Sequence, residues 1–201
     1  MSVPPGIIND ADTQVRGPDM DITQIPPYAT PSSWARFLRK AVVTANHTIW
    51  IGALADDGYG RFHGPNYGDG DLPADRRGET VRVSRWLWWA RHGPLPARTV
   101  VMHTCDLPIC TKLEHLRPGT QRENLAMAAG RDRLAHVAPG GSRIDRADRR
   151  GQAGQSRAIR SAVCAALAAG IDDPHELARI VDEVIALGNS YADQLSLFDI
   201  A

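Results

Sequence analysis

The sequence is poor in cysteine, has no long hydrophobic run and carries no net charge. Three of its 201 residues are cysteine, an odd number that argues against a disulfide scaffold and favours a reducing compartment. No stretch approaches the roughly 20 apolar residues of a membrane span. The first residues lack the basic and apolar regions of a signal peptide. We therefore expect a soluble protein of the cytoplasm.

Charge is balanced in total but unevenly distributed. Lys+Arg and Asp+Glu both amount to 23. Residues 117–160 contain ten arginines and four acidic residues, whereas residues 172–199 contain seven acidic residues and one arginine. The basic stretch favours a polyanionic partner and the acidic one a different partner. The alternative for the basic stretch is a solvated linker.

Composition and periodicity divide the chain into one main domain and several appendages. A chain of 201 residues is long enough for one substantial core, and we find no internal repeats. The predicted segments are a loose arm over 1–31, the main domain over 32–133, a basic linker over 134–156, a helical hairpin over 157–190 and a tail over 191–201.

The main domain is predicted to mix helices with short strands. Three-and-four spacing of apolar residues after Pro31 predicts a helix capped by serine. Asp57-Gly58 is typical of a hairpin turn. The three tryptophans of 86–89 are expected in the core rather than as a base-stacking platform. The expected elements are a helix over 32–44, a hairpin over 49–62, a helix over 79–89, a strand over 99–103 and a helix over 124–133.

The helical hairpin has clear boundaries in the sequence. Gly170 stops its first helix, and Asp173 before Pro174, with Glu176 three residues after the cap, starts its second. Cys164 lies on the apolar face and is predicted to be a small buried hydrophobe rather than a reactive thiol.

The segment from His103 to Asn124 carries the chemistry. Its spacing is His103-x-Cys105-x4-Cys110-x4-His115, and thiolates and imidazoles are the ligands that zinc prefers. One interpretation is a self-contained zinc finger made of these four residues. A second is most of a zinc site with a catalytic group beside it, and a third is a plain pair of buried cysteines.

This run, followed by Gly119-Thr120 and Asn124, resembles the HNH endonucleases of the His-Me finger (ββα-metal) group. It is especially similar to phage-type members and to His-Cys box homing endonucleases. The resemblance covers about residues 34–133. It also rests on His47-x-x-Trp50-x-Gly52, on Gly58-Tyr59-Gly60-Arg61-Phe62 and on Arg85 through Gly93-Pro94-Leu95-Pro96.

The resemblance implies an α+β fold with a ββα-metal core, preceded by an N-terminal helix and hairpin and followed by the αα-hairpin. It also implies that His103 is the general base and that a structural Zn²⁺ binds Cys105, Cys110 and His115. The family's fourth ligand is an upstream cysteine, whose place is taken here by His47. Histidine is a competent zinc ligand.

A catalytic Mg²⁺ or similar divalent ion is implied at Asn124, and Arg61 is implied as a phosphate clamp. The alternatives are that Asn124 caps a helix and that Arg61 is a solvated hairpin residue. Two departures from the family are Lys112-Leu113 in place of Asn-Pro and Met102 where some members carry an acidic ligand. Met102 implies either reliance on Asn124 and water or weak activity.

Together these features predict a metal-dependent endonuclease acting on double-stranded DNA, by nicking or by double-strand cleavage. Cutting both strands favours a homodimer, because each strand needs an active site. The alternative is a catalytically idle zinc module that binds DNA, or an adaptor recruited to the sliding clamp.

The tail resembles the peptide by which bacterial proteins dock onto the DNA polymerase sliding clamp. A mobile peptide with leucines and a phenylalanine suits a preformed apolar pocket. The alternative is that these residues fold back onto the helical hairpin. The residues concerned are Gln194, Leu195, Ser196, Leu197 and Phe198.

Overall fold

The computed structural model describes residues 24–64, 67, 78–129, 136–137, 143–144, 148 and 150–188. In this part of the chain no helix is long and apolar enough to cross a membrane. The elements are α1 (Pro31–Leu38), β1 (Ala41–Val43), β2 (Thr48–Trp50), β3 (Arg61–Gly64), β4 (Glu79–Arg82), α2 (Val83–His92), β5 (Thr99–His103), the 3-10 turn η3 (Leu113–His115), β6 (Leu116–Thr120), α3 (Gln121–Ala129), β7 (His136–Val137), β8 (Arg143–Ile144), α4 (Gly151–Ala168) and α5 (Pro174–Gly188).

Helix α1 is shorter than its apolar pattern predicts. The Thr30 side chain caps it by accepting from the backbone N–H of Ser33, so the cap is a threonine rather than the predicted serine. The helix ends at Leu38, and β1 follows where the sequence predicts helix up to Thr44. Residues 41–43 are all buried and pair with β2. The β-branched Val42 and Val43 favour this strand, because their side chains pack well on a pleated sheet.

The predicted hairpin over 49–62 has the expected turn, but the strands on either side of it pair with other strands and not with each other. Backbone bonds from Ala55 N to Tyr59 O (2.9 Å) and from Arg61 N to Ala53 O (2.8 Å) close a small loop around Gly58, whose φ of +84° suits glycine. The flanking strands do not pair with each other: β2 pairs with β1, and β3 pairs with β4.

The predicted helix over 79–89 is a strand followed by a helix. Residues 79–82 form β4, opposite β3, and α2 starts at Val83 and ends at a Gly93 cap. Trp86 and Trp89 are buried in the core. Trp88 is half-buried and lies 4.2 Å from the His92 ring, centroid to centroid. The prediction that these tryptophans are core residues is thus confirmed for two of the three.

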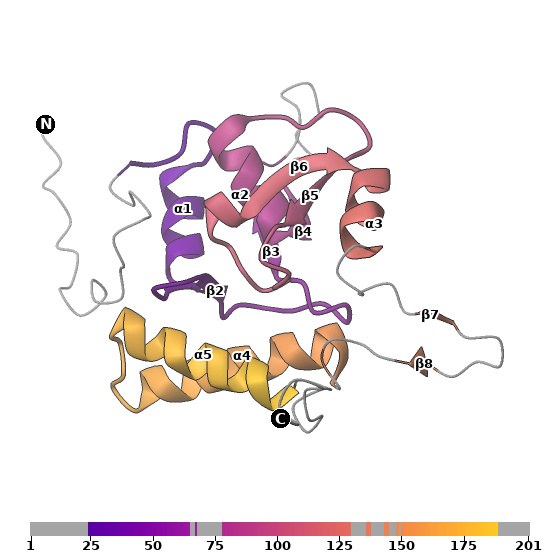
Figure 1. Cartoon of the computed structure of the whole chain (residues 1–201). Coiled ribbons are helices and arrows are strands. Elements are labelled where there is room, and N and C mark those ends of the chain that lie inside the picture. The colour runs from indigo at the N-terminus through magenta and orange to yellow at the C-terminus, as the bar shows by residue number, and fades with distance from the viewer. Residues whose placement is uncertain are drawn as a thin grey trace, which may run out of the picture.

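Strands β5 and β6 and helix α3 form a ββα unit, which confirms the α+β fold class. The strands pair from Thr99 opposite Thr120 to His103 opposite Leu116. Helix α3 follows β6 directly and packs against both strands (Figure 1). It occupies Gln121–Ala129, an earlier start than the predicted 124–133, and residues 130–133 of that prediction lie outside the described residues.

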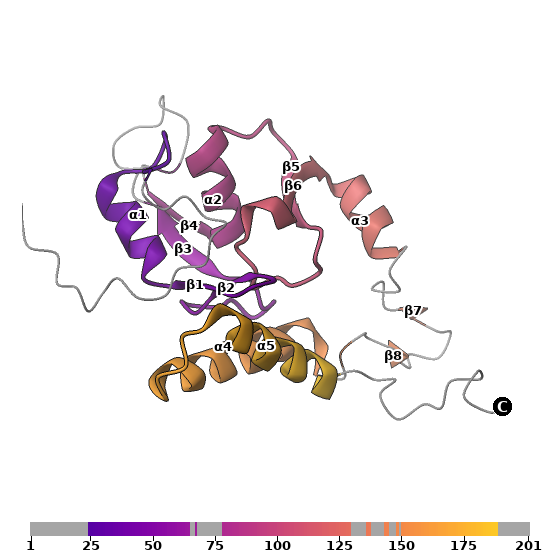
Figure 2. The same ribbon diagram turned by 60° about the vertical axis from the view of Figure 1, so that its left-hand side comes forward.

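Helices α4 and α5 form the predicted αα-hairpin, and α4 begins at Gly151 rather than at residue 157. Asp173 Oδ1 accepts from the N–H groups of His175 (3.0 Å) and Glu176 (2.9 Å), as its capping sequence predicts. The pair lies along β1 and β2 in both views (Figures 1 and 2). Its inner side chains join the main hydrophobic core, namely Ile159, Val163, Ala166, Leu177 and Val181.

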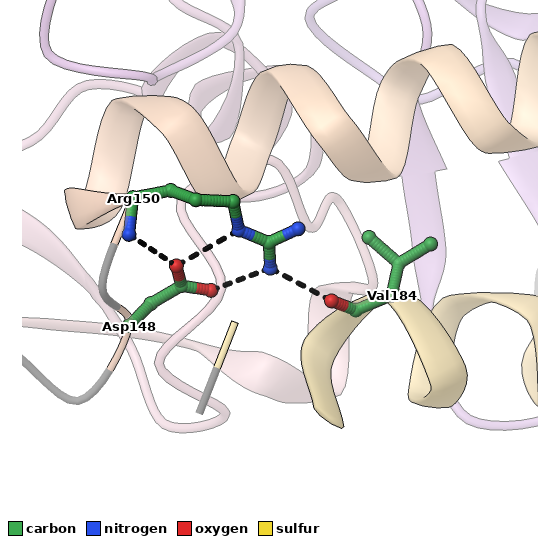
Figure 3. A network of polar contacts seen from close by, with 3 residues as sticks. All are labelled: Asp148, Arg150 and Val184. Atoms are coloured by element: carbon green, nitrogen blue, oxygen red, sulfur yellow. Dashed lines mark hydrogen bonds and ion pairs between the residues drawn. The ribbon is translucent and has the colours of Figure 1, made fainter. Parts of the chain in front are cut away.

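The two ends of the αα-hairpin meet where Arg150, paired with Asp148 before α4, bonds to Val184 of α5 (Figure 3). Arg150 Nη2 lies 2.6 Å from Asp148 Oδ2 and donates to the Val184 carbonyl at 2.7 Å. A Cβ on Gly188 would lie 2.0 Å from Asp148 Oδ2, so only glycine fits there. Arg150 is therefore a structural residue and not a solvated linker arginine.

Replacing Arg150 with alanine should lower the free energy of unfolding by about 1–3 kcal/mol, because it leaves a buried carboxylate unpaired. The Asp148 side chain is 5% exposed. Arg179→Ala, which removes the exposed ion pair with Glu183 on α5, is the matched control and should change stability by less than about 1 kcal/mol. Equal losses in urea denaturation would contradict this role.

The same contact should make stability depend on acid pH. Burial raises the pKa of Asp148, but hydrogen bonds from Arg150 outweigh it and hold the pKa below 3.8. A carboxyl with a lowered folded-state pKa stabilises the fold above its unfolded pKa and loses that contribution as pH falls through the folded value. The stability difference between wild type and Asp148→Asn should therefore shrink below about pH 4. A constant difference from pH 7 to pH 2 would contradict it.

Candidate metal centre and active site

Four side chains from three separate segments converge on one point. His47 precedes β2, Cys105 and Cys110 lie in the loop after β5, and His115 ends η3. Their potential ligand atoms all lie within 4.8 Å of one another. This is the set that the resemblance implies.

Backbone pairing of the cysteine loop with β2 brings His47 into the group. Trp50 N donates to Ile109 O at 2.9 Å, and Thr111 N donates to Thr48 O at 2.6 Å. Cys110 therefore lies opposite Ile49 as an added strand residue. His47 is next to this pairing in sequence, so its imidazole reaches the cysteines.

Local turns aim the sulfur atoms at the same point. Asp106 adopts a φ of +64°, a conformation that aspartate tolerates better than most residues, and so reverses the chain after Cys105. Lys112 N donates to Cys110 Sγ at 3.4 Å, and Cys110 Sγ lies 3.6 Å from His115 Nδ1. The imidazoles of His47 and His115 meet edge to face, with ring centroids 5.1 Å apart.

The electrostatics of the group favour a bound cation. A hydrogen bond from Cys110 lowers the pKa of Cys105 to about 3. Burial and the neighbouring thiolate raise the pKa of Cys110. Within the described residues, the buried Nδ1 of His47 has no hydrogen-bond partner. Two sulfur and two nitrogen donors fit a tetrahedral ion such as Zn²⁺, and a metal could satisfy the His47 nitrogen.

His103 lies beside this group but outside it. Its side chain is buried, with 5% exposed, and its Nε2 is 3.0 Å from the carbonyl oxygen of Cys110. The structure thus assembles the four-ligand set with His47, and not the set of the self-contained finger with His103.

The contact with Cys110 determines which nitrogen of His103 can act as a base. A carbonyl oxygen only accepts, so Nε2 carries the hydrogen and Nδ1 keeps a lone pair in the neutral ring. The imidazole also packs near Tyr59, with ring centroids 5.7 Å apart. The contact with the Cys110 carbonyl therefore fixes the orientation of the imidazole.

Asn124 lies in the first turn of α3 and is half-buried. It is not the helix cap, because Thr120 Oγ1 accepts from Glu123 N at 3.2 Å and Glu123 Oε2 accepts from Thr120 N at 2.6 Å. This is a capping box, and the alternative of Asn124 as a cap is wrong. The Thr-x-x-Glu pattern in the sequence could have predicted this capping box.

Met102 takes an apolar side chain to the place on β5 where the resemblance would allow an acidic ligand, and the nearby Glu123 carboxylate is hydrogen-bonded to Thr120. The Met102 side chain is 3% exposed, and its Cε approaches Gly119 so closely that a Cβ there would lie 2.4 Å away. Among the described residues, His47, Cys105, Cys110 and His115 form the one group of three or more His, Cys, Asp or Glu positioned for a metal. A catalytic ion at Asn124 therefore depends on that amide and on water.

Arg61 begins β3 and lies opposite Arg82 of β4. Arg82 pairs with Asp57 at 2.9 Å, and its guanidinium carbon lies 3.8 Å from the centroid of the Tyr59 ring. The sequence alone indicates Arg61, but it does not indicate Arg82 or the contact of Arg82 with Tyr59. Pairing of β3 with β4 places Arg61 and Arg82 opposite each other, and no local spacing in the sequence predicts that pairing.

The five residues of the predicted clamp-binding peptide, Gln194 to Phe198, lie outside the described residues. That interpretation and the homodimer stay predictions. Cys164, expected to be buried, is half-buried on α4 and is a free thiol.

Metal content should separate the two ligand sets. We expect mass spectrometry to find bound metal in purified wild type and to find it lost in His47→Ala and Cys110→Ala, because each change removes one of four candidate ligands. His103→Ala should retain it, since His103 contacts a carbonyl and not the cluster. Loss of metal from His103→Ala with retention in His47→Ala would restore the self-contained finger.

Comparisons with known proteins agree with this geometry. Residues 81–126 match the family model described as HNH endonuclease. This range runs from the second half of β4 to most of α3 and includes neither His47 nor Arg61. The chain is 35% identical over 75 residues to "Protein 7.7" of Escherichia phage T7, covering 37% of this chain and 48% of that protein. It thus spans about half the length of this curated relative. No solved structure matches the chain. Residues 81–126 are therefore similar to the HNH endonucleases.

Proposed function

We propose that the protein is a metal-dependent DNA endonuclease in which His103 is the general base. The observation that carries this proposal is the contact of His103 Nε2 with the Cys110 carbonyl at 3.0 Å, because a neutral ring that donates through Nε2 has Nδ1 as its proton-accepting nitrogen. The similarity of residues 81–126 to HNH endonucleases supports the same reaction class. The proposed substrate is double-stranded DNA.

In the proposed reaction, Nδ1 of His103 takes a proton from the water that attacks phosphorus. An imidazole with a pKa near neutrality is unprotonated at rest and accepts the proton readily. A hard divalent ion such as Mg²⁺, when bound at Asn124, neutralises charge on the phosphate and the leaving oxygen. Arg61 holds a phosphate oxygen through its guanidinium.

The proposed structural Zn²⁺ at His47, Cys105, Cys110 and His115 would hold the cysteine loop in place. Cys110 is the residue that makes this matter for the reaction, because its sulfur belongs to the metal group while its carbonyl orients His103. Loss of the ion would free the loop and with it the orientation of the imidazole.

A catalytically idle DNA-binding module is the second candidate function. The observation that favours it is the apolar, buried Met102 where some family members carry an acidic ligand. Both candidates bind DNA, and they differ only in hydrolysis.

Nicking of supercoiled plasmid in Mg²⁺ tests the proposal. We expect wild type to nick, and His103→Ala to do so about 10²–10⁴-fold more slowly, because the general base is lost. His175→Ala, an exposed histidine on α5, is the control and should nick as wild type does. Equal nicking by wild type and His103→Ala would overturn the role of His103 as the base, and no nicking by wild type would favour the idle module.

Asn124→Ala should raise the Mg²⁺ concentration required for half-maximal nicking, because it removes the side-chain oxygen proposed to bind the ion. A titration of Mg²⁺ against nicking rate measures this. An unchanged midpoint with a normal rate would show that Asn124 does not bind the ion.

A further inference from the structure

A second arginine lies beside the proposed base. Arg82 extends from the end of β4 over the face of Tyr59, with its guanidinium carbon 3.8 Å from the ring centroid. The same Tyr59 ring packs near His103, with centroids 5.7 Å apart. The Tyr59 ring therefore connects a guanidinium to the imidazole of the candidate active site.

Arg82 and Arg61 project from the same face of the β3–β4 pair. They lie directly opposite each other in the antiparallel register, and opposed residues point to the same side. Their neighbour Phe62 points to the other side and is buried in the core. The two arginines thus lie on one face of the strand pair, and Arg82 reaches the Tyr59 ring that packs near His103.

We propose that Arg82, supported by Tyr59, binds a second phosphate of the DNA backbone, next to the phosphate held by Arg61. The proposal rests on the proposed function, since it places this contact beside the hydrolysed bond. Guanidinium groups suit phosphate oxygens because they offer two parallel donors. A guanidinium stacked on an aromatic ring is also oriented before the ligand arrives.

In the absence of DNA, the Asp57 carboxylate pairs with the Arg82 guanidinium that is proposed to bind the phosphate. Its Oδ2 lies 2.9 Å from Arg82 Nη2, and its Oδ1 accepts from Tyr59 N at 3.1 Å. Burial raises the pKa of Asp57, but hydrogen bonds from Tyr59 and Arg82 outweigh it and keep the pKa below 3.8. Asp57 is therefore an anion at neutral pH, and a phosphate must compete with it.

The exchange of Asp57 for a phosphate costs little. The Arg82 and Asp57 side chains are 46% and 43% exposed, and exposed ion pairs contribute little because water screens them. A backbone phosphate at Arg82 prevails over Asp57 because the neighbouring phosphate of the same strand is held by Arg61 at the same time. Asp57 thereby positions Arg82 without blocking it.

Helix α4 fixes the turn that carries these residues. A Cβ on Gly58 would lie 2.8 Å from Ala153 Cα and 3.0 Å from Gln152 O. The turn between Asp57 and Tyr59 therefore fits directly on the first turn of α4. This contact holds the Tyr59 ring in place relative to β4 and His103.

The salt dependence of DNA binding tests the phosphate contact in the full-length protein. A fluorescent DNA duplex is titrated without added Mg²⁺ and without chelator, so that binding is measured apart from hydrolysis. Arg82→Gln should reduce the slope of log affinity against log salt by about 0.9, the value for one phosphate contact. Arg179→Gln, an exposed ion-paired arginine on α5, is the control and should leave the slope unchanged. An unchanged slope for Arg82→Gln, or no binding by wild type, overturns the proposal.

Asp57→Asn provides a second arm, because its amide oxygen still accepts from Tyr59 N but carries no charge. We expect it to tighten DNA binding severalfold, and the gain should vanish in the Asp57→Asn, Arg82→Gln double variant. A gain that persists in the double variant would come from general charge and would overturn the proposed competition. Thermal melting verifies that each variant is folded.

These binding results are independent of the nicking assay. A slope change with no nicking by wild type would support the Arg82 contact and defeat the nuclease proposal. Normal nicking by wild type with an unchanged slope for Arg82→Gln would support the nuclease proposal and overturn the Arg82 contact.

Discussion

The added-strand pairing between β2 and the cysteine loop is the interaction on which the rest of the site depends. Thr48 O accepts from Thr111 N and Ile109 O accepts from Trp50 N, so two segments far apart in sequence become neighbours along their backbones. Because backbone groups make the pairing, it sets the positions of His47 and Cys110 along the paired segments without needing particular side chains. Ile49 and Ile109, both fully buried, then exclude water from these bonds.

Cys110 links this backbone pairing to both parts of the site, because its side chain and its carbonyl group make two different contacts. The sulfur lies in the four-ligand group, and the carbonyl oxygen lies 3.0 Å from His103 Nε2. A shift of the Cys110 backbone would disturb both at once. The contact uses a main-chain oxygen, so it does not involve the side chains of Lys112 and Leu113, which stand where many of the HNH endonucleases that this segment resembles have Asn-Pro.

The parts of this protein that the sequence predicts well are those with short-range signals. Strand 99–103, the Asp57-Gly58 turn and the Asp173 cap all depend on adjacent residues, and the ligand spacing is local apart from His47. The misses come from competing or long-range effects. Ala41 and Val42 satisfy helical spacing as well as they fit a three-residue strand, and tertiary pairing with β2 decides between them. Arg82 and Tyr59 meet only because β4 folds back onto β3, which no local pattern encodes.

The contact of Gly188 with Asp148 and Arg150 has a mechanical consequence. The chain enters the αα-hairpin and leaves it at one place, where a Cβ on Gly188 would overlap Asp148. A pull on the chain beyond Gly188, such as a bound partner would exert, therefore loads the Asp148–Arg150 pair first. The backbone N–H of Ala45 also donates to the Pro174 carbonyl at 2.9 Å, so the segment that carries His47 contacts the start of α5. The αα-hairpin therefore connects its own end at Gly188 to the segment that supplies a candidate metal ligand.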